Sequence, residues 1–220
     1  MNKLIVGNWK MNGTLELVDE FLEGLNNNVI VGLPIIFIAY AKSKNPNFQI
    51  AAQDCSIFND FGAHTGEVSA KMLSESGCKY VIIGHSERRK TFDSDSISNI
   101  LKKLQNAVLN GMTAILCVDE KYDELLASQT VEFLKNHKSQ VVLAYEPLSA
   151  IGTGIVPSIS EISDVLKNLK SKYFGIRTIY GGSVNSKNAK EILDIDSVDG
   201  VLIGGASLKL DEINAIAKFA

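Results

Sequence analysis

A glutamate stands where an apolar run of the sequence ends. Glu146 follows Val141–Tyr145, which predicts a buried strand, and Pro147 disfavours a helical conformation for it. Gly152 and Gly154 then close the stretch. A carboxylate on a rigid strand end, beside a loop that can move, suits an enzyme that abstracts a proton and excludes water. An ordinary strand that ends in a polar loop has the same pattern, and for this stretch alone that interpretation is slightly favoured.

Other reactive side chains follow other apolar runs in the same way. Lys10 comes after the first run and His85 after the fourth, while Gly181-Gly182-Ser183 and Gly204-Gly205 come after the last two. Singly, each has a common structural explanation: a surface charge, a structural histidine or a glycine turn. Jointly they supply an ammonium, an imidazole, a carboxylate and loops whose N–H groups bind an anion. That set suits proton abstraction next to the carbonyl of a small phosphorylated substrate.

The elements that must position these groups alternate along the chain. Eight short apolar runs, separated by amphipathic helical patterns, predict parallel strands covered on both faces. We expect an α/β fold with a single (β/α)₈ barrel domain over residues 1–220, and a doubly wound open sheet is the alternative. At 220 residues the chain is below the ~250 typical of such barrels, so its outer helices and loops must be short. The strand candidates are Leu4–Gly7, Val29–Leu33, Gln49–Gln53, Tyr80–Gly84, Ala114–Val118, Val141–Tyr145, Thr178–Tyr180 and Gly200–Ile203.

Two features of the helices can be predicted from local sequence. Ile35–Tyr40 has strand propensity, but the preceding run competes for the same place in the pattern, so we predict a helix that Pro34 opens. Side chains that begin helices are expected at Ser94 and Asp95, and again at Ser158 and Ser160.

The composition excludes several classes of protein. The chain has 22 basic and 25 acidic residues, a net charge of −3, so it has no basic excess for nucleic acid. Its three cysteines are odd in number and widely spaced, which fits reduced thiols in a cytoplasmic protein better than disulfides or a zinc site. No apolar run is long enough for a signal peptide or a membrane span, so we expect no membrane partner.

Seven segments, in order along nearly the whole chain, resemble those of the triosephosphate isomerase family. The resemblance implies a (β/α)₈ barrel that interconverts dihydroxyacetone phosphate and D-glyceraldehyde 3-phosphate through an enediolate. The segments around His85 and Glu146 are the most specific to that family. The matching segments are Asn8–Asn12, Ala52-Gln53, Gly62–Glu67, Ile83–Arg89, Ala144–Gly154, Tyr180–Val184 and Gly204–Leu208.

The resemblance also implies a role for each reactive residue. Glu146 would be the catalytic base, and His85 a neutral electrophile, which the start of a short helix at residues 86–88 would favour. Lys10 would balance the negative charge of phosphate and oxyanion. Asn8 would hold the substrate oxygens and the head of Lys10, and Glu87 would pair with Lys10. Proton transfer of this kind implies no metal and no organic cofactor.

Phosphate binding and dimerisation are implied by the same resemblance. The phosphate would be bound through the backbone at Gly152, Ser183, Gly204 and Gly205, and residues 147–154 would form a lid that excludes water. The protein would be a homodimer in which the loop at residues 63–67 inserts into the partner. The expected dimer contacts are Thr65, Glu67 and Arg88.

Some positions depart from the family pattern, and other functions remain open. Ser149 stands where the family usually has Trp in the first lid hinge, and Asp119 where it usually has Gly. One alternative is another phosphate-binding barrel enzyme such as a Schiff-base aldolase, for which Lys10 is the obvious candidate lysine. Another is an inactive barrel retained as a binding protein, although the presence of all the reactive groups argues against it.

Overall fold

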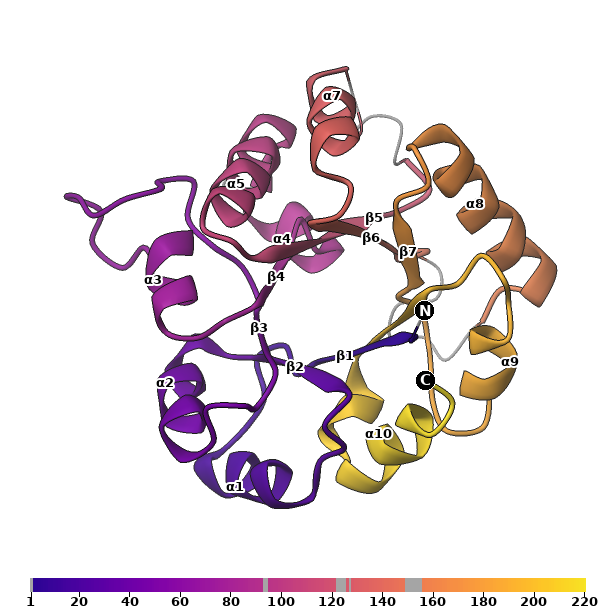
Figure 1. The fold of residues 1–220 in the computed structure, drawn as a ribbon, viewed down its shortest axis with the longest axis horizontal. Coiled ribbons are helices and arrows are strands. Elements are labelled where there is room, and N and C mark those ends of the chain that lie inside the picture. Colours follow the sequence, from indigo (N-terminus) through magenta and orange to yellow (C-terminus); the bar gives the residue numbers. More distant parts are fainter. Residues whose placement is uncertain (1, 93–94, 122–125, 127, 149–155) are drawn as a thin grey trace.

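Eight parallel strands close into a barrel at the centre of the molecule (Figure 1). The structure is a computed structural model that describes residues 2–92, 95–121, 126, 128–148 and 156–220. Each strand pairs with the next in sequence, and β1 pairs with β8 to complete the ring. The predicted (β/α)₈ barrel is therefore confirmed, and the open sheet was wrong. The strands are β1 Leu4–Asn8, β2 Val29–Leu33, β3 Ile50–Ala52, β4 Tyr80–Ile83, β5 Thr113–Val118, β6 Val141–Tyr145, β7 Arg177–Tyr180 and β8 Gly200–Ile203.

The described helices form a ring outside the barrel (Figure 1). Several are short, as the length of the chain required: α3 and α4 have 6 residues each and α9 has 5. The ambiguous run after Pro34 is helical, as predicted. The helices are α1 Leu15–Gly24, α2 Ile35–Lys44, α3 Ala70–Glu75, α4 Ser86–Thr91, α5 Ile97–Leu109, α7 Ser128–His137, α8 Ile159–Lys172, α9 Ala189–Leu193 and α10 Leu210–Ala217, with a 3₁₀ turn η2 at Gly205–Leu208.

The apolar strands are explained by burial on both faces. One set of side chains, including Val6, Ile82 and Ile115, fills the interior of the barrel. The alternate set, including Ile5 and Leu116, packs outward against the helices. Because both faces exclude water, the strands read as continuous apolar runs rather than alternating ones. The packed interior leaves the strand ends, rather than the barrel centre, as the place for chemistry.

One helix start was predicted correctly and one was wrong. Ser158 caps α8: its hydroxyl accepts the N–H of Glu161, whose carboxylate in turn accepts the N–H of Ser158. By contrast, α5 begins at Ile97 after Ser96. Asp95 does not cap it, because its carboxylate is buried between two cationic side chains, and Ser94 lies outside the described residues.

Neither a membrane span nor a metal cluster occurs in the part of the chain that the structure describes. None of the helices there is long and apolar enough to cross a bilayer. Nor do three or more His, Cys, Asp or Glu side chains come together there as metal ligands would.

Candidate active site

A pocket of 310 Å³ opens at the carboxyl ends of the strands. It is lined from β1, β4, β6, β7 and β8, strands that lie apart in sequence and meet only because the barrel closes. Most of the residues predicted to act on substrate line this pocket together. They are Asn8, Lys10, His85, Glu146, Ser183, Gly204 and Gly205, while Gly152 lies outside the described residues.

His85 and Glu146 face each other across the pocket. The Nε2 atom of His85 lies 3.1 Å from Oε1 of Glu146. Both residues are buried, with 5% and 2% of their surfaces exposed. A carboxylate and an imidazole in contact at a nearly dry site are suited to moving a proton, because little water competes for either group.

The hydrogen bonds of His85 define its tautomer. His85 is the N-cap of α4, and its Nδ1 accepts a hydrogen bond of 3.2 Å from the backbone N–H of Glu87. An Nδ1 that accepts carries no proton, so the proton of the neutral ring is on Nε2. The Nε2–H therefore points toward Glu146 and the pocket, where it can donate to an oxygen that develops negative charge.

The carboxylate of Glu146 is held close to the barrel end. Its backbone N–H donates to the carbonyl of Val118, at 2.7 Å, so the chain is still fixed where β6 ends. Its Oε2 is buried, and no donor among the described residues makes a hydrogen bond to it. Cys117 lies nearby, and burial first, then the Glu146 charge, raises the pKa of its thiol well above the usual range. The thiol of Cys117 therefore keeps its proton at neutral pH.

Lys10 has an unusual backbone conformation that two side chains support. Its φ is 54°, in the left-handed region that non-glycine residues rarely adopt. Asn8 accepts the N–H of Lys10 through Oδ1 at 3.0 Å, and Gln53 donates to its carbonyl at 2.9 Å. The predicted ion pair is present, with Nζ of Lys10 2.6 Å from Oε1 of Glu87. The ammonium also lies beside Gly204, where an added Cβ would be 3.8 Å from Nζ.

Gln53 is a residue whose contribution the sequence interpretation missed. Its side-chain amide bridges the carbonyls of Lys10 and Gly32, at 2.9 and 2.8 Å, and so ties the loop after β1 to β2. A signal was available, because Gln53 is a polar residue at the end of a predicted strand, the same position that identified the other site residues.

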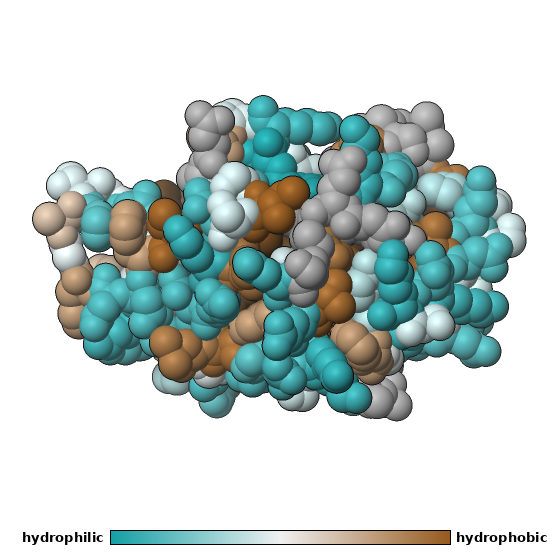
Figure 2. Space-filling view, turned by 90° about the horizontal axis from the view of Figure 1, so that it is seen from above, coloured by the Kyte–Doolittle hydropathy of each residue, from teal (hydrophilic) through white to brown (hydrophobic). Residues whose placement is uncertain are grey.

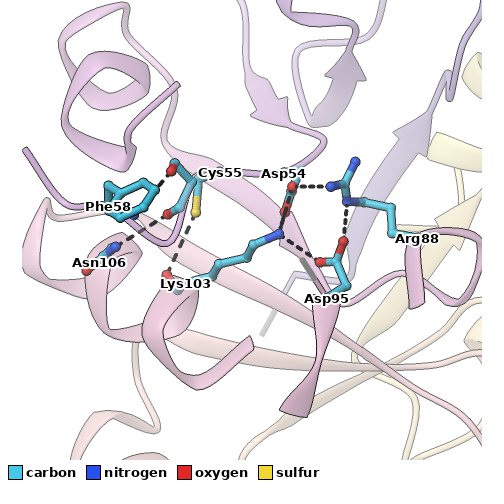
Figure 3. Close-up of polar contacts among 8 residues, drawn as sticks. Asp54, Cys55, Phe58, Arg88, Asp95, Lys103 and Asn106 are labelled. Atoms are coloured by element: carbon cyan, nitrogen blue, oxygen red, sulfur yellow. Dashed lines mark hydrogen bonds and ion pairs between the residues drawn. The ribbon is translucent and has the colours of Figure 1, made fainter. Parts of the chain in front are cut away.

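The predicted dimer contacts lie elsewhere. Glu67 and Arg88 line a second pocket, of 620 Å³, together with other residues of the loop that joins β3 to α3. This loop projects from the barrel (Figure 1). Arg88 is engaged within its own chain, with its guanidinium 2.8 Å from Asp54 and 2.9 Å from Asp95. Lys103 completes the cluster by contacting both carboxylates (Figure 3).

Comparison with known proteins gives one consistent result. The family model described as triosephosphate isomerase matches residues 3–220. The triosephosphate isomerase of Francisella tularensis subsp. novicida is 37% identical in an alignment that covers 98% of this chain and 96% of the relative. That of Pseudomonas savastanoi pv. phaseolicola is 36% identical in an alignment that covers 99% of this chain and 98% of the relative. The crystal structure of triosephosphate isomerase from Bartonella henselae superposes with a TM-score of 0.81 at 30% identity, covering 100% of this chain and 99% of that one.

The fold, the pocket and the full-length matches agree. Members of this family interconvert dihydroxyacetone phosphate and D-glyceraldehyde 3-phosphate through an enediolate, which is a step of glycolysis. This chain is such an isomerase, because the chain belongs to the triosephosphate isomerase family.

Proposed function

We propose that Glu146 is the base that moves the substrate proton. Its carboxylate takes a proton from C1 of dihydroxyacetone phosphate and returns it to C2, so that the ketose becomes the aldose. The observation that supports this assignment is the position of Glu146 Oε1, 3.1 Å from His85 Nε2 at the wall of a pocket that also contains Lys10. The buried Oε2, to which none of the described residues donates, leaves basic capacity free for the substrate.

His85 acts as the electrophile. As the proton leaves C1, the carbonyl oxygen at C2 gains negative charge, and Nε2–H of His85 donates to it. The hydroxyl proton on O1 then moves to O2 by way of the same ring. The backbone N–H of Glu87 supports this role, because it occupies Nδ1 and holds the proton on Nε2. A preorganised donor needs no reorientation during the reaction.

Lys10 and Asn8 stabilise the charged end of the substrate. The ammonium of Lys10 lies between the carboxylate of Glu87 and the glycine loop at Gly204. It offsets the charge of the phosphate and of the enediolate oxygen, and Glu87 keeps it in place. The phosphate itself is bound by Ser183, Gly204, Gly205 and Gly152, largely through backbone N–H groups.

The active enzyme is a cytoplasmic homodimer of single-domain chains that uses no cofactor. The loop between β3 and α3 projects from the barrel and carries apolar side chains at its surface, with Phe58 39% and Phe61 67% exposed. Figure 2 shows patches of apolar surface, in tan and brown, at this projecting end. Thr65 and Glu67 of this loop contact the partner subunit.

A coupled assay for interconversion of the two triose phosphates tests this proposal. We expect activity in the wild-type chain and its loss in Glu146→Gln, with the fold retained by circular dichroism. An unchanged rate in Glu146→Gln would exclude Glu146 as the base. Borohydride trapping in the presence of dihydroxyacetone phosphate tests the Schiff-base aldolase alternative. We expect no covalent adduct, because Nζ of Lys10 is engaged with the carboxylate of Glu87 at 2.6 Å rather than free to attack a carbonyl carbon.

A further inference from the structure

The phosphate end of the pocket is built from two loops on neighbouring strands. Ser183–Asn185 belong to the loop after β7, and Gly204–Ala206 follow β8. The sheet itself aligns these two strands through a single residue pair. The β7–β8 ladder aligns Tyr180, the last residue of β7, with Val201, the second residue of β8. By contrast, β6 and β7 align in register over four pairs. The relative position of the two loops therefore depends on contacts beyond the sheet.

A glutamate on α10 makes such a contact. Both oxygens of the Glu212 carboxylate accept from Ser186: Oε2 from the backbone N–H and Oε1 from the hydroxyl, each at 3.1 Å. Ser186 directly follows Asn185, which lines the pocket. Hydrogen bonds to a carboxylate are stronger than those between neutral groups, and two of them fix orientation as well as distance.

The loop after β7 is also held in shape by its own residues. The side chain of Asn188 donates to the carbonyl of Ser183 at 2.9 Å and accepts the N–H of Asn185 at 2.8 Å. The segment 183–188 is thus a closed unit, and Glu212 fastens this unit to the helix. Figure 1 shows α9, which follows the loop, beside α10 in the outer ring.

The helix that carries Glu212 is continuous with the second loop. The 3₁₀ turn η2 follows Gly204, and α10 begins two residues after η2 ends. Ile213, which directly follows Glu212, is fully buried against the barrel. Its Cδ1 lies so close to Gly7 of β1 that a Cβ added to that glycine would be 2.8 Å away. The packing of Ile213 therefore fixes Glu212 relative to the barrel. The short covalent connection from η2 to α10 fixes it relative to the Gly204 loop.

Glu212 does not line the pocket, and its charge has the wrong sign to bind phosphate. The backbone N–H of Ser186, and next its hydroxyl, hold the pKa of the Glu212 carboxyl below its usual range, so it is ionised at neutral pH. A carboxylate near a phosphate site weakens phosphate binding by simple repulsion. The position of Glu212 is explained by its hydrogen bonds to Ser186, which hold the loop after β7 in place.

We propose that Glu212 is a positioning residue for the phosphate site, which fixes the loop after β7 relative to the loop after β8 through Ser186. This inference rests on the proposed function of those two loops. It assigns to Glu212 a contribution to the affinity for the phosphate group rather than to the proton transfer.

The test measures KM, kcat and competitive inhibition by inorganic phosphate in Glu212→Ala, Glu212→Gln and Asp211→Ala. Asp211 is the matched control, since it is an acidic residue in the same helical turn. In Glu212→Ala we expect KM and the phosphate inhibition constant to rise about 3- to 30-fold, with a smaller change in kcat. Glu212→Gln keeps groups that can bond to Ser186 and should recover most of the affinity. Asp211→Ala should behave as wild type.

The outcomes separate this inference from the function on which it rests. If charge alone matters, Glu212→Ala and Glu212→Gln will both bind phosphate more tightly than wild type, and the positioning role is overturned. Equal inhibition of wild type and Glu212→Ala overturns it as well. If phosphate does not inhibit the wild-type enzyme, the proposed phosphate site itself fails. Should Glu212→Ala not fold, Ser186→Ala removes one of the two bonds without changing charge, and a KM equal to that of wild type would then reject the role.

Discussion

Gly181 makes room for the side chain of Glu146. A Cβ atom on Gly181 would lie 2.6 Å from Cγ of Glu146 and 3.4 Å from its Oε1. These two residues directly follow the neighbouring strands β6 and β7, whose register brings Tyr145 opposite Tyr180. The glycine is therefore required by the position of the carboxylate rather than by a turn.

Replacing Gly181 with alanine should displace the carboxylate without disturbing the backbone. We expect Gly181→Ala to lower kcat by roughly 10- to 100-fold, because small displacements of a reacting group are costly. The inhibition constant of inorganic phosphate should change less than kcat, since two of the proposed phosphate contacts, Gly204 and Gly205, lie on the loop after β8. Steady-state kinetics with phosphate as inhibitor measure both, and an unchanged kcat would show that Glu146 tolerates the contact.

Shortening the base should have a similar effect for a different reason. Glu146→Asp withdraws the carboxylate by about 1 Å, which should cost on the order of 10²-fold in turnover. The coupled assay measures this effect, with a thermal melt to show that the variant is folded. A turnover equal to that of the wild type would contradict the assignment of Glu146 as base.

The ion-pair cluster beside the second pocket should be important for stability. Lys103 is 1% exposed and lies 2.7 Å from Asp95 and 2.9 Å from Asp54. Lys103→Met removes one of the two cationic side chains that contact those carboxylates, and should lower the free energy of unfolding by about 3–5 kcal/mol. Chemical denaturation at a fixed protein concentration measures this loss in the free energy of unfolding. The double variant Asp95→Asn/Lys103→Met should be less destabilised than the sum of the two single variants, and strict additivity would contradict a coupled cluster.

The cap of α8 should make stability depend on pH. The hydroxyl of Ser158, and next its backbone N–H, lower the pKa of Glu161 below its ordinary value of 4.5. A lowered pKa means that the ionised form stabilises the fold. This contribution is present above pH 4.5 and is lost as the pH falls through the lowered pKa. Ser158→Ala should therefore lower Tm more at pH 7 than at pH 3. A Tm difference between wild type and Ser158→Ala that is the same at both pH values would argue against this role of the Glu161 charge. So would a pH-dependent difference that persists when Glu161 is replaced by Gln.

If the protein is a homodimer, its mass in solution should be that of two chains, and a substitution at the interface should lower it. The wild-type chain should sediment at twice the 23.9 kDa of one chain. Thr65→Arg places a long charged side chain at the tip of the projecting loop and should shift the protein toward the monomer, with a parallel loss of activity. A wild type that sediments as a monomer would refute the proposal. A Thr65→Arg variant that stays a dimer would remove Thr65 from the interface.

The strands and their reactive ends could be predicted from the sequence. The eight predicted strands differ from those observed by at most one residue at either end, because strands buried on both faces are uninterrupted apolar runs. His85 and Glu146 stood out because each follows such a run. The prediction that failed, a helix start at Asp95, depended on a capping preference that ion pairs with Arg88 and Lys103, seven and eight positions away, override.

What the sequence by itself determined is the order of the barrel's elements and the chemistry placed at the end of each strand. Only the tertiary structure decided which of those ends face one another, and which residues hold them there. Gln53 supports Lys10 across 43 positions, and Glu212 holds Ser186 across 26. Such contacts have no local signature, since they depend on how the barrel closes and where each helix packs against it. The periodicity of the chain records burial, whereas these partnerships are fixed by geometry that appears only when the barrel has formed.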